Sequence, residues 1–246
     1  MADIEVGAST HRGDDGGGLP HEDLAVALSR IARTLEHTDD LQGTLKAIVS
    51  CAIGTVPGAQ HASISAVKMR REVTTPVSTS ELILQVDQAQ YDAGEGPCLD
   101  VLYARRTVHV TDMATEQRWP GFSRKASELG AGSMLSVRLF VEGDDLGALN
   151  LVNESPHAFD DDSEHVALLF ASHAAVAIVG AERQEQFRDA LVRRDVIGQA
   201  MGIVMERYGL APERSFAVLA RLSQDANRKL HDLAQELVET RHLPRS

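Results

Sequence analysis

Hydrophobic residues recur along the chain with two spacings, one typical of helices and one typical of strands. Spacings of three and four predict one helix between Pro20 and Leu35 and a second over about 40–55. Alternation of apolar and polar residues over 62–66 predicts a strand, with 71–77 as its hairpin partner. The first part of the chain is therefore expected to mix helices with paired strands.

Both spacings continue through the middle of the chain. Apolar residues at helical spacing cover 81–92, and the glycine-containing loop 94–98 leads into a short helix over 98–105. A short apolar run predicts a strand over 107–111, and a Trp-Pro-Gly turn leads into a helix over about 121–129. This order of elements favours an α+β domain.

The strongest hairpin signal lies further on. Alternating runs over 133–141 and 146–152 flank a Gly143-Asp144-Asp145 turn. These elements predict an α+β domain over 21–180. Residues 1–20 are polar and rich in glycine, so they bury too little apolar area to offset the entropy of ordering. We expect them to form a disordered arm.

A long helical pattern begins at an acidic cluster over 160–163 and continues without proline. It predicts either one connector helix over 163–206 that is partly coiled coil, or two helices with a kink near Gly180; the unbroken periodicity favours the first. Over 190–241 the pattern predicts an all-α three-helix tail. Its first helix should end at Tyr208-Gly209, its second should begin at Pro212 with an apolar face of Phe216, Leu219 and Leu222, and its third should begin near Arg228.

Charge is distributed unevenly between these parts. The chain of 246 residues has a formal net charge of -12. Residues 183–246 hold 11 Lys+Arg against 9 Asp+Glu, whereas residues 1–182 hold 13 against 27. The acidity therefore belongs to the front of the chain, and the total charge does not exclude a polyanionic partner for the tail.

Composition narrows the class of protein further. Two cysteines, Cys51 and Cys98, fit a reducing compartment better than a disulfide scaffold. We find no basic and apolar leader pattern, and no stretch approaches about 18 uninterrupted apolar residues. These features favour a cytoplasmic protein with no membrane partner.

The sequence contains few signals of catalytic chemistry. Metal-ligand spacing, a phosphate-binding glycine loop and a nucleophile elbow are not seen, so we expect neither an enzyme nor a resident metal or cofactor. Cys98 lies where a loop enters a short helix, and a helix N-terminus can lower the pKa of a thiol. It is therefore either a redox or covalent sensor or a small buried residue that closes the loop.

Three segments of the tail carry a family resemblance. IGQAMGIVMER over 197–207, FAVL over 216–219 and LSQDANRKL over 222–230 closely resemble the ANTAR domain. That family consists of three-helix RNA-binding modules in bacterial transcription antiterminators. The family often has Lys where this chain has Met201 and Ala where it has Ser215.

The front of the chain is similar to another family, the GAF sensor domains that are paired with ANTAR in actinobacterial regulators. The resemblance covers about 38–180 and implies an antiparallel sheet with flanking helices. It is carried by QY at 90–91, GEGPCLD at 94–100, VTD at 110–112, RWP at 118–120, LGALNL at 146–151 and AFD at 158–160. Tyr91, Glu95 and Cys98 are the candidate sensor residues, for a small-molecule ligand that the resemblance does not identify. The pattern of cyclic-nucleotide-binding members is not seen.

The resemblance implies a signal-responsive regulator. A dimer of ANTAR tails would bind paired stem-loops in a nascent transcript and prevent termination, acting on the transcription machinery indirectly. Gly202 lies inside a predicted helix and costs about 1 kcal/mol relative to Ala, which indicates close approach of either another helix or an RNA backbone. The candidate RNA-binding residues are Arg193, Arg194, Gln199, Gly202, Arg207, Arg221, Asn227, Arg228 and Lys229.

Two other functions remain open at this stage. In the first, the front domain senses a ligand or redox state and the helical tail mediates protein–protein contacts. In the second, Cys98 acts as a nucleophile or peroxide sensor. Salt-dependent RNA binding distinguishes the first from an antiterminator, and thiol titration tests the second.

Overall fold

The computed structural model describes residues 40–68, 72–103, 106–141 and 144–242. The arm predicted over 1–20 and the helix predicted between Pro20 and Leu35 lie outside the described residues. The chain divides into two compact units, the first ending at Ala177 and the second beginning at Ile178.

The first unit is built around an antiparallel five-stranded sheet. Its strand order is β2-β1-β5-β4-β3, and every neighbouring pair is antiparallel. The strands are β1 (His61–Lys68), β2 (Glu72–Ser78), β3 (Thr107–Val110), β4 (Ser133–Val141) and β5 (Asp144–Asn153). Each strand expected from the sequence is therefore confirmed.

The β4–β5 hairpin differs from the prediction at its turn. Asp144 and Asp145 pair with Val141 and Phe140, so they belong to β5 and not to the turn. Pairing continues to the end of the hairpin because the ladder supplies hydrogen bonds there that the predicted turn would forgo. Further along β5, Gly147 has φ +145°, and a Cβ at this position would lie 1.9 Å from the backbone oxygen of Ser65. Glycine is therefore required where β5 passes β1.

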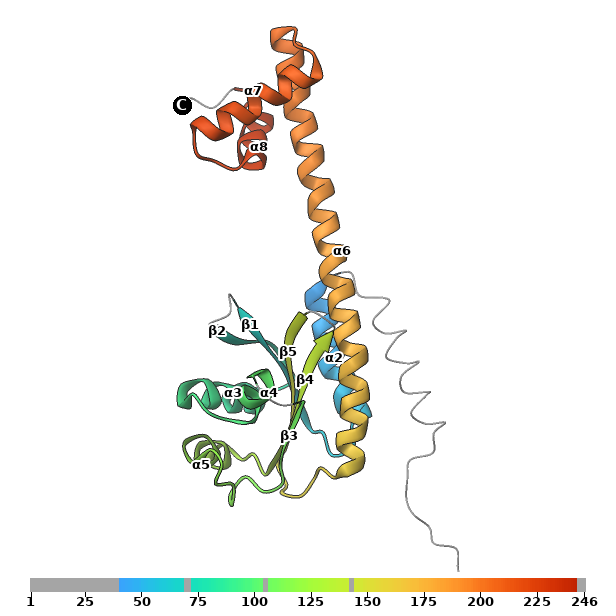
Figure 1. Ribbon diagram of the computed structural model, residues 1–246, viewed down its shortest axis with the longest axis vertical. Helices are drawn as coiled ribbons and strands as arrows, with labels where there is room; N and C mark the ends of the chain where they lie inside the picture. Colours follow the sequence, from blue (N-terminus) through green and yellow to red (C-terminus); the bar gives the residue numbers. More distant parts are fainter. Residues whose placement is uncertain (1–39, 69–71, 104–105, 142–143, 243–246) are drawn as a thin grey trace, which may run out of the picture. The chain divides into compact units, whose positions relative to one another are not determined.

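Helices cover both faces of this sheet. Figure 1 shows α3 (Glu81–Ala93), α4 (Pro97–Tyr103) and α5 (Pro120–Leu129) on one face, and α2 (Leu41–Thr55) with the first part of α6 on the other. The core between the sheet and the first helical layer includes fully buried Phe122. The predicted helices over 40–55, 81–92, 98–105 and 121–129 are confirmed with small shifts of their ends.

The helix α6 runs from Asp161 to Tyr208 without interruption, as the continuous interpretation predicted. The carboxylate of Asp160 accepts hydrogen bonds from the backbone N–H and the hydroxyl of Ser163, which satisfies donors at the start of the helix. In the first unit α6 buries one face, formed by Val166, Ala167, Phe170, Ala171, Ala174 and Ala175.

The length and composition of α6 bear on the expectation of no membrane partner. Among the described helices, α6 is long and apolar enough to cross a membrane by length and composition. Of the most apolar 18-residue stretch of α6, 39% is buried inside the molecule. The core helix of a soluble protein can have the same length and composition. Leu169 and Val176 are exposed on the surface of α6.

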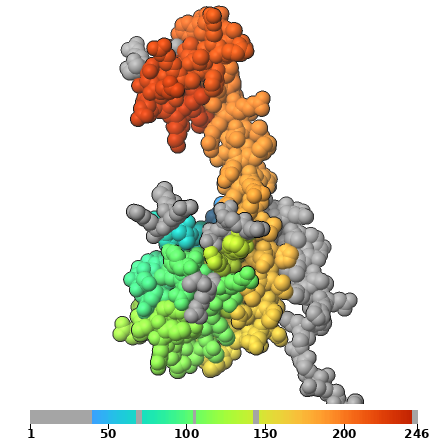
Figure 2. Space-filling model, in the orientation of Figure 1, coloured from blue at the N-terminus to red at the C-terminus, as the bar shows by residue number. Residues whose placement is uncertain are grey.

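The second unit consists of the end of α6 with α7 (Pro212–Asp225) and α8 (Leu230–Thr240). Figure 2 shows the side chains of α7 and α8, in red, closed against the end of α6. The buried core is Ala200, Val204, Leu219, Leu233, Ala234 and Leu237. Phe216 was predicted on the apolar face but is 45% exposed. The third helix begins at Leu230, after Asn227 adopts a left-handed φ of 50°.

Candidate functional site

The face of the sheet that is covered by α3, α4 and α5 holds a buried polar network centred on Asp87 of α3. Its carboxylate accepts hydrogen bonds from the hydroxyls of Ser63 (2.6 Å) and Thr75 (2.9 Å) and from the side-chain amide of Asn150 (3.0 Å). Asp87, Ser63 and Asn150 are fully buried. Burial raises the pKa of Asp87 to about 7, although the three hydrogen bonds oppose this shift. A group of this kind is poised between its charged and neutral forms near neutral pH.

Tyr91 belongs to the same network. Its hydroxyl lies 2.6 Å from the hydroxyl of Ser65 and 2.8 Å from that of Thr75. Burial, followed by the nearby carboxyl of Asp87, raises the pKa of Tyr91, so the phenol stays protonated. Tyr91 and Asp87 thus share Thr75 as a partner and connect α3 to three strands of the sheet, β1, β2 and β5.

Cys98 lies in the first turn of α4 and against this network. Its backbone N–H donates a hydrogen bond to the side-chain oxygen of Gln90 at 2.8 Å, and the whole residue is buried. Burial, with a contribution from Asp87, raises the pKa of the Cys98 thiol to about 12. The suggestion that the helix N-terminus lowers this pKa is therefore wrong, because desolvation of a thiolate outweighs the helix dipole here.

Glu95, the third candidate sensor residue, bonds to the start of α5. Its Oε1 accepts hydrogen bonds from the backbone N–H groups of Gly121 (2.6 Å) and Phe122 (3.1 Å). These donors lie in the first turn of α5, whose N-cap residue Trp119 provides no side-chain cap. Glu95 therefore caps α5 and stabilises the loop, while Tyr91 and Cys98 meet at the network.

Sequence reasoning missed Asp87, the residue at the centre of the network. A signal for it was present, since Asp87 and Gln90 lie on the same face of α3 as Ile83 and Val86. Polar residues within the apolar face of a helix are buried polar groups that must find partners. Asn150, in the centre of β5, supplies one of them.

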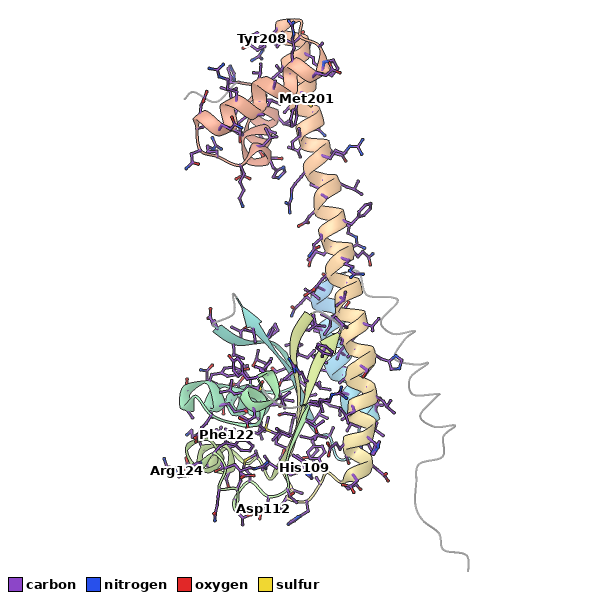
Figure 3. All side chains as sticks on the ribbon, in the orientation of Figure 1. His109, Asp112, Phe122, Arg124, Met201 and Tyr208 are labelled. Carbon is purple, nitrogen blue, oxygen red and sulfur yellow. The ribbon has the colours of Figure 1, made fainter. Side chains whose placement is uncertain are left out.

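In the second unit, five of the nine candidate RNA-binding residues line two adjoining hollows. The first hollow, of about 940 Å³, contains Arg193, Arg194 and Gln199 in its lining. The second, of about 770 Å³, contains Gln199, Gly202 and Arg207. Gln199 therefore lies on the border between them. Figure 3 shows Met201, which lines the first hollow, and Tyr208 at the end of α6.

The linings also contain an aromatic residue and an arginine that were not predicted as site residues. Phe216 of α7 borders the first hollow, and Arg241 borders the second. Phe216 was overlooked because its helical spacing placed it with the core residue Leu219. Arg241 follows the last turn of α8, where its φ of 60° ends the helix.

Gly202 is surrounded by open space. A Cβ built at this position meets no described atom within 4 Å, and the residue is exposed. Tight packing against another helix of this unit is therefore wrong as an explanation for the glycine. Close approach of a molecule outside this chain remains.

The other candidate residues lie along α7 and the turn before α8, and the linings of the two described hollows do not include them. Arg221 lies 3.7 Å from the carboxylate of Asp225, and Nη1 of Arg228 donates to Glu236 at 2.5 Å. Ser223 accepts the backbone N–H of Arg228 and donates its hydroxyl to the carbonyl of the same residue. Asn227, Arg228 and Lys229 are thus presented on an ordered turn at which Lys229 is the N-cap residue of α8.

Comparisons with known proteins agree with this two-unit arrangement. A model of the GAF domain matches residues 38–179, and a model of the ANTAR domain matches residues 185–238. The chain belongs to the GAF domain family and carries an ANTAR domain after it. GAF domains are sensor domains and ANTAR domains are RNA-binding antitermination domains, so the general kind of function is that of a sensing regulator. No curated protein matches the sequence.

Solved structures show the same fold in the first part of the chain. A GAF domain of a phosphoenolpyruvate-protein phosphotransferase from Coxiella burnetii has 18% identity and a TM-score of 0.53, covering 67% of this chain and 98% of its own. Free methionine-R-sulfoxide reductase from Neisseria meningitidis has 16% identity and a TM-score of 0.51, covering 68% and 95%. The phytochrome photosensory core module of Stigmatella aurantiaca has 12% identity and a TM-score of 0.57, covering 87% and 46%. At these identities the likeness concerns the fold.

Proposed function

We propose that this protein is a cytoplasmic transcription antitermination regulator that acts as a homodimer. Its GAF domain senses a signal, and two ANTAR tails bind paired stem-loops in a nascent transcript and prevent termination. The observation that carries the proposal is the ANTAR match over 185–238, which includes the lining of the first hollow and all of the second except Arg241. GAF and ANTAR domains are sensor and RNA-binding regulatory domains, and we propose no enzymatic step.

Dimerisation is supported by the exposed surface of α6. Leu169, Val176 and Phe187 are exposed and follow one another by 7 and 11 residues. These spacings correspond to two and three helical turns, so the three side chains lie along one face, as in a helix that pairs with a second copy. A dimer also explains how sparsely charged tails can bind RNA, because the second tail binds at high effective concentration.

Sensing is assigned to the network around Asp87. It joins α3 to the sheet through groups that are hydrogen-bonded and buried, so a change in one partner changes several bonds. We propose that an unidentified small molecule or partner alters this network, with Tyr91 and Cys98 at its edge. Glu95 contributes by holding the adjacent loop to α5.

Filter binding tests the RNA proposal. The full chain, first shown to be a dimer by sedimentation, is mixed with an RNA of two hairpins with randomised loops at low and moderate salt. We expect selection of a bound pool and a linear fall of log affinity with log salt. Absence of binding at low salt by a proven dimer contradicts the proposal.

A double variant, Arg228→Ala with Lys229→Ala, separates RNA binding from protein docking. Loss of two phosphate contacts should weaken binding to all RNAs in the pool and reduce the salt slope by about 2. Exposed Arg214→Ala with Lys125→Ala removes the same charge elsewhere and serves as the control. If the tail docks only to protein, neither the unmodified protein nor the two double variants show salt-dependent RNA binding.

A further inference from the structure

The first hollow of the second unit contains an exposed aromatic ring beside two guanidinium groups. Phe216 projects from α7, and its neighbours across the hollow are Ile197 and Met201 of α6. The ring remains 45% exposed, although Leu219 one turn later is completely buried. The core of this unit is therefore complete without Phe216, and its ring is available to a partner.

The rim of this hollow is rich in groups that bind phosphate. Arg193 and Arg194 line it, together with Asp195. Arg193 lies 3.3 Å from Asp189 one turn earlier, and both side chains are mostly exposed. An exposed pair of this kind contributes little and is readily exchanged for another anion. Gln199, also exposed, adds an amide that can both donate and accept hydrogen bonds.

We propose that this hollow binds a single unpaired nucleobase of RNA, stacked on the ring of Phe216. Arg193 and Arg194 contact the phosphates on either side, and Gln199 hydrogen-bonds to an edge of the base. This inference rests on the proposed function and adds to it a subsite for one base. A flat apolar floor with a cationic rim fits a base with its backbone, and loops of RNA present such bases unstacked.

A second copy of the chain fits the hollow less well. Ala190, Arg194, Ile197 and Met201 are separated by alternating four and three residues, which places them on one face of α6. Pairing of this face across a two-fold axis would bring Arg194 close to its own copy. Like charges in that position oppose pairing, whereas they favour a polyanion.

The test compares Phe216→Leu with Phe216→Tyr in the full-length dimer. Leu keeps apolar volume but removes the aromatic face, and Tyr keeps that face. The probes are RNAs recovered from the two-hairpin pool, each with one loop base replaced by 2-aminopurine, whose fluorescence is quenched on stacking. Phe140→Leu, which changes a ring of similar exposure in β4 of the first unit, is the matched control.

We expect Phe216→Leu to weaken binding about tenfold and to abolish quenching at one loop position, with the salt slope unchanged. Phe216→Tyr should retain both the affinity and the quenching, and Phe140→Leu should leave both as in the unmodified protein. Equal affinity and equal quenching for Phe216→Leu overturn the inference while the proposed function stands. If the unmodified dimer binds no RNA, the proposed function fails and the inference falls with it. A change of oligomeric state in Phe216→Leu with unchanged RNA affinity assigns the hollow to a second copy instead.

Discussion

The side-chain amide of Asn150 on β5 donates a hydrogen bond to the carboxylate of Asp87 on α3 at 3.0 Å, in a place with no solvent exposure. A strand at the centre of the sheet and a helix on its inner face are thus joined through a titratable group. The pKa of that group is raised to about 7 by burial. The proton on Asp87 is therefore coupled to the packing of α3 on the sheet.

This coupling predicts a pH-dependent contribution to stability. The pKa of Asp87 is raised from 3.8 to about 7 on folding, so the folded state holds the proton more tightly than the unfolded chain. Its contribution is complete below about pH 4 and is lost as the pH rises to about 7, with a slope of up to about 1.4 kcal/mol per pH unit. Asp87→Asn should remove this slope from the free energy of unfolding, measured by denaturant titration between pH 4 and 8.

A control variant separates the contribution of Asp87 to the pH dependence from the contributions of other acids. Glu116 and Asp160 have lowered pKa values, chiefly from a hydrogen bond with Arg118 and with Ser163 respectively, so they add stability that is lost as the pH falls. Asp92→Asn changes an exposed acid of the same helix and should retain the slope that Asp87→Asn loses. Parallel curves for Asp87→Asn and the unmodified protein would contradict the assignment.

The thiol of Cys98 should be inert in the folded protein. Burial raises its pKa to about 12, so almost no thiolate is present at pH 8, and the side chain is inaccessible to a reagent. In a Cys51→Ser variant, where Cys98 is the remaining cysteine, a disulfide reagent should react only after denaturant is added. Fast labelling without denaturant would restore the redox-sensor or nucleophile hypothesis.

Periodicity predicted most of the elements because burial of one face decides both helix and strand in this chain. It worked for α6, which runs without interruption as predicted, and for β4, where apolar residues recur at every second position from Leu135 to Val141. It failed at Asp87 and Phe216, because polarity alone places Asp87 outside and Phe216 inside. The hydrogen bonds that compensate Asp87 come from residues 12 to 63 positions away, and no local pattern records them.

The ion pair between Arg228 and Glu236 predicts tighter RNA binding when the acid is neutralised. Nη1 of Arg228 lies 2.5 Å from Oε2 of Glu236, and the two side chains are 42% and 38% exposed. Glu236→Gln leaves the guanidinium without a competing carboxylate, so RNA affinity should rise about two- to fivefold with a stability change under about 1 kcal/mol. Glu239→Gln changes the net charge equally on the same helix, and filter binding of both separates the pair from the total charge. Identical affinities for the two variants would remove Arg228 from the phosphate contacts.

Replacement of Gly202 by Ala should have opposite effects on folding and on RNA binding. Inside α6, Ala is favoured over Gly by about 1 kcal/mol, and a Cβ at this position meets no described atom within 4 Å. Gly202→Ala should therefore raise the midpoint of thermal unfolding. If RNA backbone approaches here, the added methyl group overlaps with it at a cost of about 1–3 kcal/mol, which is about five- to hundredfold in affinity. Gly54→Ala, at an exposed site of α2 that is equally open, should stabilise the helix without weakening RNA binding. A stabilised Gly202→Ala protein that binds RNA as tightly as the Gly54→Ala control would exclude Gly202 from the RNA interface.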